Sequence, residues 1–558
     1  MKIRTKALAL VLSLIMICSV AAIAEGTDDI MTPYGPYPET VTMTTVKRSD
    51  TNPQWSVGDD VDNNVVTRYI LEKINVKTET LWETESSAFI EKLTLDIVAD
   101  NLPDMFTLDN DDYLVYRMLL ENGMIADLTE PYDKCANWFL RETAESFDYK
   151  HFEPYTEDGR IMAIPTGRYG YEHNQLWVRT SALEDCGMTA DDLTTLEGIE
   201  AFLTKCKELY PDTLGLALNA TDPLTNYGVS YSAEPIAEAF GATPRYWLKG
   251  DDGAITYGSI MPGMKDALTV LADWYQKGLI DKEFATRTGN GQTDAIMNGG
   301  QAVACFAPWW WGWTGDAIAK NGTLPEGTDV HKIWTVINGP VDSEGKFNAP
   351  WPSVAGTTLF VSAKCATPEA AIKILNVEYD QGRGFDAEAY AIYEDDGVDS
   401  PNPAGLRDVG WGYLNPTGYV NMEYADVVPR YGHGIVRYIE SNGEDTSGFN
   451  MPAQENESAT VLRGVQGPDY TVGLGTYFSR VVAAPLTDAE NVEFVYPAFS
   501  QVTESMADLL PSLQTLEQTF VLQVIMGQRS VDDFDAFVEQ WLAEGGQTLI
   551  DEVTALVD

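Results

Sequence analysis

Four tryptophans within five residues are the most unusual feature of this chain. They lie in the run Pro308-Trp309-Trp310-Trp311-Gly312-Trp313. An indole face matches the apolar C–H face of a sugar ring, so such side chains can hold a saccharide by stacking. If the run is a strand, alternation places Trp309 and Trp311 on one side and Trp310 on the other. At most half of the run would then contact a ligand, and we expect Trp310 and Trp313 to be core residues.

Other polar and aromatic side chains could also bind hydroxyl groups. Carboxylate, amide and guanidinium groups form paired hydrogen bonds with neighbouring hydroxyls. Each of these residues also has a structural alternative. Charged side chains are common in solvated loops, and Arg179 could form an ion pair. Trp55 or Trp82 could cover the first helix. Together with Trp309 and Trp311, the ligand-binding candidates are Arg48, Asp50, Trp55, Trp82, Asp109, Asp111, Tyr171, Arg179, Tyr231, Trp351 and Trp411.

The N-terminal part of the chain predicts the elements that would position several of these candidates. Residues 41–46 alternate as in a strand, 65–74 have one apolar helical face, and 75–82 alternate again. A helix at 89–98 and a strand at 104–108 complete two strand–helix–strand units, which predicts a largely parallel sheet. Ligand sites lie at the carboxyl ends of such strands. Those ends carry Arg48, Asp50 and Trp55, then Trp82, then Asp109 and Asp111.

The rest of the chain predicts a second set of elements. We expect helices at 194–209 and 262–278, an extended polar and aromatic segment at 164–178, and a strand at 357–361. Residues from about 385 to 500 are rich in Gly, Pro, Asn and Tyr without clean periodicity, which predicts irregular structure. This order of elements suits two lobes that share the chain discontinuously.

Length and charge narrow the class of protein. The chain has 558 residues, with 85 acidic against 36 basic side chains and a formal net charge of −49. Its hydrophobic content of 44% is ample for a folded core, and its length predicts two large lobes or about three domains. A surface so acidic repels phosphate backbones and anionic lipids, which argues against nucleic-acid and membrane-surface binding.

The first residues have the layout of a secretory signal peptide. A basic start and an apolar run end in Ala22-Ile23-Ala24, which predicts a signal at 1–24 and an extracellular protein. The alternative is a lipid anchor on Cys18, which is disfavoured because the bulky Ile17 precedes it. The other five cysteines are odd in number and dispersed, so they predict neither a disulfide framework nor a zinc site.

Catalytic motifs are weak. The chain has four histidines, and it contains no His-Glu-x-x-His sequence, nucleophile elbow or phosphate loop. A secreted glycoside hydrolase stays open as an alternative, because paired carboxylates in a Trp-lined site would suit it. A surface glycan adhesin or a calcium-dependent binder is a third interpretation. Asp109-Asn110-Asp111-Asp112 and Asp395-Asp396-Gly397 match parts of a calcium loop without its twelve-residue pattern.

Several short segments follow one another in an order typical of one family. They are Asn101-Leu102-Pro103-Asp104, Gly159-Arg160-Ile161-Met162-Ala163-Ile164-Pro165, Leu176-Trp177-Val178-Arg179, Gly278-Leu279-Ile280-Asp281-Lys282-Glu283-Phe284-Ala285 and Met297-Asn298-Gly299-Gly300-Gln301-Ala302-Val303. Lys282 stands in place of the family's Pro, and Gln301 in place of its usual charge. This set resembles the family 1, carbohydrate-type extracellular solute-binding proteins of ATP-binding cassette (ABC) importers, of the longer Gram-positive type.

The resemblance implies an α/β clamp of two lobes, each a mostly parallel sheet flanked by helices, with the chain crossing between them at a hinge. The implied boundaries are 25–168 and 352–388 for the N-terminal lobe, and 169–351 and 389–558 for the C-terminal lobe. An oligosaccharide or related small solute would bind between the lobes. Trp309, which follows a proline as in the family, and Tyr231 would stack on it.

The resemblance also implies how the protein would act. The lobes would close on the solute and deliver it to a transmembrane ABC permease, without catalysis. We expect a monomer with no cofactor, no bound metal and no nucleic-acid partner.

Overall fold

The computed structural model describes residues 30–49, 55, 58–221, 223–224, 228–250, 252–322, 324–352, 355–393, 414–418 and 420–557. The predicted signal peptide at 1–24 with Cys18, the candidates Asp50 and Trp411, and Asp395-Asp396-Gly397 lie outside the described residues. The side chain of Asp111 is also outside the description.

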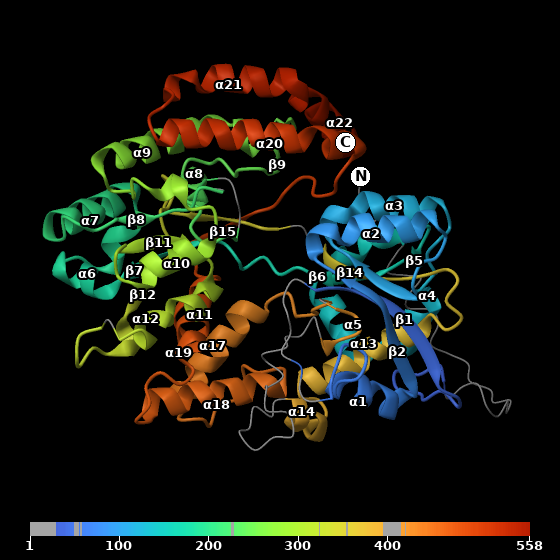
Figure 1. Cartoon of the computed structure of the whole chain (residues 1–558). Helices are drawn as coiled ribbons and strands as arrows, with labels where there is room; N and C mark the ends of the chain where they lie inside the picture. Colours follow the sequence, from blue (N-terminus) through green and yellow to red (C-terminus); the bar gives the residue numbers. More distant parts are fainter. Residues whose placement is uncertain are drawn as a thin grey trace.

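The described residues form two lobes that lie side by side (Figure 1). In the N-terminal lobe, β1 and β2 pair with each other, while β14 lies between β3 and β6. Helix α1 begins where the side chain of Asn64 accepts hydrogen bonds from the backbone of Val66 and Thr67, and ends at the left-handed Asn75. The elements of this lobe are β1 (Val41–Arg48), α1 (Val65–Ile74), β2 (Val76–Thr84), α2 (Ser86–Val98), β3 (Met105–Leu108), α3 (Tyr113–Glu121), α4 (Thr129–Cys135), α5 (Trp138–Ser146), β4 (Thr156–Glu157), β5 (Arg160–Ile161), β6 (Ile164–Gly167), β14 (Ala355–Val361), α13 (Glu369–Gly382) and α14 (Ala387–Tyr393).

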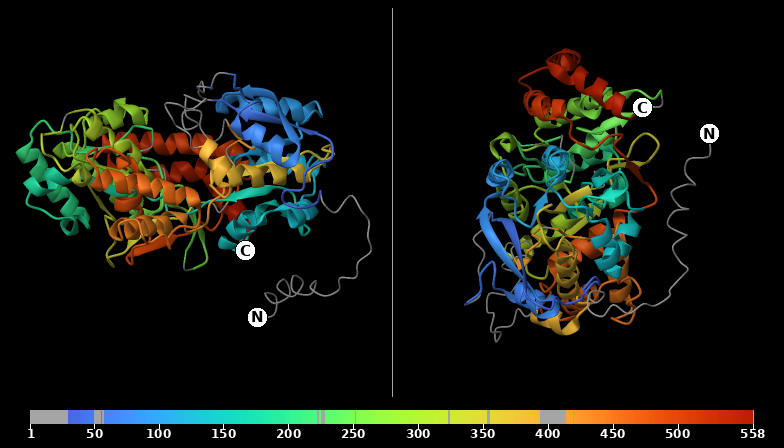
Figure 2. Two further views of the ribbon diagram at one scale, coloured as in Figure 1. Left: turned by 90° about the horizontal axis from the view of Figure 1, so that it is seen from below. Right: turned by 90° about the vertical axis from the view of Figure 1, so that its right-hand side faces the viewer.

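The C-terminal lobe is built on a four-stranded sheet with the order β12-β7-β11-β8. Helix α20 packs along α9, and α21 and α22 follow it at the outer surface (Figures 1 and 2). The elements before the return to the other lobe are β7 (Gln175–Arg179), α6 (Thr180–Asp185), α7 (Leu196–Leu209), β8 (Leu216–Ala217), α8 (Glu234–Glu238), β9 (Trp247–Lys249), β10 (Ile255–Tyr257), α9 (Pro262–Lys277), α10 (Asn290–Asn298), β11 (Ala304–Ala307), α11 (Gly312–Gly315), α12 (Ala317–Lys320), β12 (Trp334–Ile337) and β13 (Phe347–Pro350). Those after it are α17 (Val427–Glu440), α18 (Pro452–Gln466), α19 (Leu474–Thr476), β15 (Val492–Val495), α20 (Glu504–Ile525), α21 (Phe534–Trp541) and α22 (Gln547–Val557).

The core of the C-terminal lobe lies on both faces of its sheet. Leu176 and Val178 of β7 face one hydrophobic cluster, and Trp177 between them faces another, as a period of two requires. Residues of α7, α9 and α20 complete the first cluster. Among the described residues, no helix combines the length and apolar character that a membrane span requires.

Strand direction differs from the sequence prediction. The strands and helices predicted between 41 and 108 are present, and β1 pairs with β2 in parallel. However, β14 is antiparallel to both β3 and β6, and β7 is antiparallel to both β11 and β12. The prediction of mostly parallel sheets is therefore wrong, because strands that enter a sheet from the other lobe are inserted in the opposite direction.

The chain passes between the two sheets at several points. Residues 168–174 connect β6 to β7, and a second crossing connects β13 to β14. Further on, Thr417 binds Glu378 of α13 in the N-terminal lobe, whereas α17 packs against residues 477–486 of the C-terminal lobe. The lobe boundaries predicted at 168/169 and 351/352 fall within the first two crossings, and the numbers themselves stay predictions.

The region predicted to be irregular, about 385–500, contains regular structure. Helices α14, α17, α18 and α19 and strand β15 all lie in its described part. This part of the prediction is wrong, and one of these helices, α19, packs against α11, which contains Trp313.

Candidate functional site

One edge of the N-terminal lobe faces the other lobe and carries two of the predicted residues. The carboxyl ends of β1, β3 and β6 and the start of β14 meet at this edge, from which both crossings leave. Arg48 ends β1, and Asp109 directly follows β3. Beside them, the side-chain amide of Asn110 donates to the carbonyl of Ser500 from the C-terminal part of the chain, at 3.4 Å.

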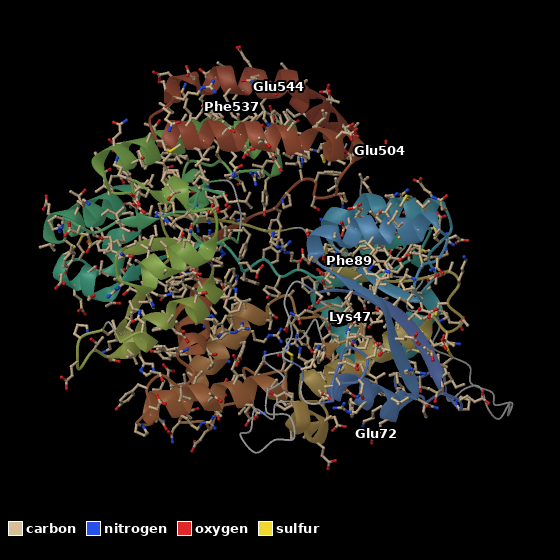
Figure 3. The ribbon with its side chains drawn as sticks, viewed as in Figure 1. Lys47, Glu72, Phe89, Glu504, Phe537 and Glu544 are labelled. Atoms are coloured by element: carbon tan, nitrogen blue, oxygen red, sulfur yellow. The ribbon has the colours of Figure 1, made fainter. Side chains whose placement is uncertain are left out.

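Arg48 is neutralised at this edge. Its guanidinium lies 3.2 Å from the Asp109 carboxylate and 3.5 Å from that of Asp112, and 4.2 Å from the centre of the Phe89 ring. Figure 3 shows Phe89 on the side of its lobe that is nearer to the C-terminal lobe. The hydroxyl of Thr357 donates to Asp109, whose side chain remains 49% exposed. Asp109 can therefore accept hydrogen bonds from a ligand, whereas Arg48 chiefly orients it.

Trp82 covers a helix, and the helix is α2 rather than the first one. Its indole N–H donates to Asp96 at 2.7 Å, Lys92 lies 4.5 Å above its ring, and Phe89 packs against it. Trp55 is half-buried against the main hydrophobic cluster. Trp82 therefore has a structural role, although on a different helix from the one that the sequence alternative named.

The tryptophan run is not a strand. Strand β11 ends at Ala307, residues Trp309–Trp311 form a 3₁₀ turn, and α11 follows. Successive side chains of such a turn point in three directions, so the predicted alternation is wrong. Trp309 and Trp311 are buried, whereas Trp313 is 42% exposed and not the core residue that was predicted.

Trp311 and Tyr231 belong to the interior of the C-terminal lobe. The Trp311 ring packs edge-on against Trp177 and Trp334 at 5.1 and 5.0 Å, and its N–H donates to the Tyr231 hydroxyl at 2.9 Å. Tyr231 in turn donates to Asp294, and burial raises its pKa well above the usual value. Neither ring is accessible to a ligand, because both are 0% exposed.

Trp309 lies beneath an arginine that sequence analysis missed. The Arg480 guanidinium is 4.1 Å from the Trp309 ring, 4.8 Å from Tyr431 and 5.6 Å from Trp313. Trp309 itself is only 3% exposed, so its ring offers no free face here. Among the described residues no carboxylate lies within 4 Å of Arg480, and its buried Nε and Nη1 have no hydrogen-bond partner. Rings and a cation of this kind attract each other through the ring quadrupole.

Tyr171 and Trp351, predicted separately, lie together at the two crossings. Their ring centres are 5.4 Å apart, and Phe494 of β15 packs edge-on against both. Trp351 also packs on Gly170, where an added Cβ would meet the ring at 2.0 Å, which only glycine permits. On the outside of this cluster Tyr496 is 61% exposed.

Tyr169, on the first crossing, lies within reach of charges from both lobes. Burial raises its pKa, and Glu172 and Glu423 add to the effect while Arg480 and Arg383 oppose it. The side chain as a whole is half-buried.

Arg179 is separated from all of these residues. It ends β7 and lies opposite Trp334 of β12, at the end of the sheet away from the first crossing. Figure 1 shows α6, which begins after Arg179, on the far side of its lobe from the N-terminal lobe. The structure therefore does not bring Arg179 to the predicted site between the lobes.

Partnerless polar atoms gather where β7 begins. Among the described residues, the buried atoms without a hydrogen-bond partner include both ring nitrogens of His173, Oε1 of Gln175 and the indole N–H of Trp309, besides the two Arg480 nitrogens. Burial lowers the pKa of His173 to about 3, so its ring is neutral. Buried polar groups usually find a protein, water or ligand partner, which makes this end of the sheet a candidate binding site.

No group of three or more His, Cys, Asp or Glu side chains that could hold a metal ion occurs within the described part of the chain. The Asp109–Asp112 segment instead forms a short capped turn, in which the Asp112 carboxylate accepts from the Asp109 backbone at 3.0 Å.

The sequence of the chain matches known proteins only in part. No family model matches the chain. A carbohydrate ABC transporter substrate-binding protein of Streptococcus pneumoniae serotype 4 is 26% identical over 177 residues, which is 32% of this chain and 33% of that protein. The chain thus matches about a third of the length of this curated relative.

Solved structures are similar over nearly the whole chain. The alginate-binding protein AlgQ2 without calcium ion has a TM-score of 0.58 at 16% identity, covering 93% of this chain and 98% of that one. A FusA EF-hand mutant from S. pneumoniae, in complex with fructo-nystose, has 0.59 at 14%, covering 93% and 99%. A solute-binding protein associated with an HMO-binding ABC transporter of Bifidobacterium longum infantis has 0.58 at 12%, also covering 93% and 99%. The resemblance seen in the sequence is thus confirmed at the level of the fold, which is that of the two-lobed solute-binding proteins of ABC importers.

Proposed function

We propose that this chain is the extracellular substrate-binding component of an oligosaccharide ABC importer. It holds its solute between the facing edges of the two lobes, closes around it and delivers it to a transmembrane permease. The solute leaves with its bonds intact. The protein works as a monomer, and it is exported by the signal peptide at residues 1–24.

The observation that carries this proposal is the set of partnerless polar atoms at the start of β7, beside the crossings between lobes. A hinge is where a bound solute can touch both lobes at once and so favour the closed form. The two-lobed fold and the partial match to a carbohydrate-binding relative support the same function.

Residue roles follow from the geometry around the hinge. The half-buried Arg480 contacts the ligand, and Trp309 supports its guanidinium from below. Asp109, oriented by Arg48, accepts a hydroxyl from the N-terminal side. The aromatic pair Tyr171 and Trp351 flanks the ligand at the crossings.

A thermal-shift screen of the mature protein over neutral and acidic oligosaccharides tests the proposal, followed by calorimetry on the best ligand. We expect one oligosaccharide to raise the melting temperature, and small-angle scattering to show a smaller radius of gyration with it. No response to any saccharide would contradict the proposed function.

Product analysis separates this function from glycoside hydrolysis. After long incubation with the bound oligosaccharide, we expect the saccharide to be recovered unchanged. Shorter products would favour a hydrolase, with two of the carboxylates between the lobes as acid and nucleophile or base.

A further inference from the structure

Arg179 lines a cavity of about 530 Å³ at the outer end of the C-terminal sheet. A second cavity, of about 640 Å³, adjoins it and shares Asp212, Thr213, Leu214 and Gln301. Cavities of this size suit small ligands. These cavities are separate from the proposed solute site between the lobes. The crossings and Arg480 lie at the opposite end of β7 and β11.

The Arg179 guanidinium has no carboxylate partner. Within the described residues it makes no ion pair and no side-chain hydrogen bond, and its closest ring is Trp334 at 5.9 Å. It reaches its position over Gly300, where an added Cβ would lie 2.7 Å from Nη1. By contrast, the guanidinium groups of Arg287 and Arg383 are paired with Asp281 and Glu423.

An unpaired guanidinium is unexpected in a chain with 85 acidic side chains. Burial lowers the pKa of Arg179, and Tyr210 is the one titratable neighbour that opposes the effect. The Tyr210 hydroxyl is itself engaged by Asp185. A desolvated, cationic fork without its usual partner is therefore offered to the cavity.

The other residues that line the cavity indicate which class of anion would bind there. Ser181 and Gln301 can donate further hydrogen bonds, and Ala182, Leu214 and Val303 give the cavity an apolar wall. Asp212 lies in the part shared with the second cavity. Its negative charge and the net charge of −49 on the chain both disfavour the binding of polyanions. A planar carboxylate matches the arginine fork in a two-point contact, and a short apolar body matches the wall.

We propose that this cavity is a second ligand site, which binds a small monocarboxylate through Arg179. The carboxylate pairs with the guanidinium over Trp334 and Gly300, and its apolar part lies against Ala182, Leu214 and Val303. The site is independent of the solute site between the lobes.

Titration of the mature protein with sodium hexanoate, observed by ligand-detected NMR and calorimetry, tests this site. We expect saturable binding of hexanoate, no binding of hexanol, and no displacement by inorganic phosphate. Arg179→Met should weaken hexanoate at least tenfold, while the matched surface variant Arg463→Met should leave it unchanged. Equal binding of hexanol, displacement by phosphate, or full retention in Arg179→Met would overturn the proposal.

A second variant keeps the test decisive if Arg179→Met does not fold. Asp212→Asn removes an exposed negative charge from the cavity and should tighten hexanoate two- to fivefold. An unchanged or weaker affinity would overturn the proposal. The saccharide affinity of this variant should match that of the unmodified protein, which also separates a failure here from a failure of the proposed transport function.

Discussion

The two ends of the C-terminal sheet hold polar groups in opposite ways. At the inner end, next to the crossings, Arg480 and His173 are enclosed with buried nitrogens that have no partner among the described residues. At the outer end, Arg179 also lacks a carboxylate but opens into a cavity. Each end therefore carries an arginine guanidinium without a carboxylate partner, and both arginines belong to the C-terminal lobe.

The two ends differ in the free-energy cost of having no bound ligand. A buried donor without a partner costs roughly 1–3 kcal/mol relative to a bonded one, whereas a donor in an open cavity keeps its water. The inner end therefore gains most from an occupant that bridges both lobes. The outer end is a site whose occupancy changes stability little. This contrast suggests that ligand capture is coupled to closure at the inner end alone.

The largest effect that we expect is on the unfolding free energy, when Glu234 is substituted. Glu234 is a buried carboxylate at the inner end. It accepts from the side-chain amide of Asn174, on the first crossing, at 2.9 Å, and burial raises its pKa to about 8. A raised folded-state pKa stabilises the fold fully below about pH 4.5, and this stabilisation is lost as pH rises through about 8. Glu234→Gln should therefore gain stability over the unmodified protein across this range, by a few kcal/mol at pH 8.

Chemical unfolding of both proteins at a series of pH values measures that difference. His173 has a lowered pKa and acts with the opposite sign, but it is present in both proteins, so its contribution cancels. Parallel stability curves for the two proteins would show that Glu234 is ionised without penalty.

Arg480→Ala should give the next largest effect, on ligand binding rather than on pH. The variant loses the guanidinium that contacts the ligand, and we expect about 2–3 kcal/mol of lost binding, since hydrogen bonds to charged groups are worth about 1.5–3 kcal/mol each. Arg480→Lys is the matched control, because it keeps the charge but not the planar stacking on Trp309. Calorimetry should find the lysine variant intermediate. Unchanged affinity in both variants would remove Arg480 from the site.

The two buried tryptophans should separate binding from stability. Trp311→Phe loses the hydrogen bond to Tyr231 and some core volume, so we expect about 1–2 kcal/mol lower unfolding free energy with saccharide affinity unchanged. Trp309→Phe weakens the support of Arg480 and should lower affinity by about 0.5–1 kcal/mol. The reverse pattern would mean that Trp311, and not Trp309, communicates with the ligand.

The first strands and helices could be predicted from sequence because their periodicity is unambiguous. Helices α1 and α2 each bury one face, which apolar residues at spacings of three and four indicate, and the first half of β2 alternates between buried and exposed residues. Strand ends then placed Arg48 and Asp109 at one edge, where the structure joins them at 3.2 Å. Nothing in the spacing of Tyr171 and Trp351 could predict their contact, because it depends on two crossings far apart in the chain.

Helix α17 shows why the later region was misread. Its sequence contains Pro429, Gly432 and Gly434, which usually indicate a break. Here the glycines allow close packing: a Cβ on Gly432 would lie 2.9 Å from Ala484, and one on Gly434 would lie 3.0 Å from Gly448. Arg480 lies on the element against which α17 packs, so missing that helix meant missing the arginine as well.

Salt should have the smallest effect, and should act on the outer end. Because Arg179 lines an open cavity, its attraction to hexanoate is screened by added ions, and we expect a two- to threefold weaker affinity between low salt and 0.5 M NaCl. Arg480 is enclosed by three rings, so its contacts should be screened far less. Calorimetric titrations of hexanoate and of the saccharide over the same salt series compare the two ends directly. Equal salt dependence at both ends would show that the inner end is as open to solvent as the outer one, and that its partnerless groups are hydrated.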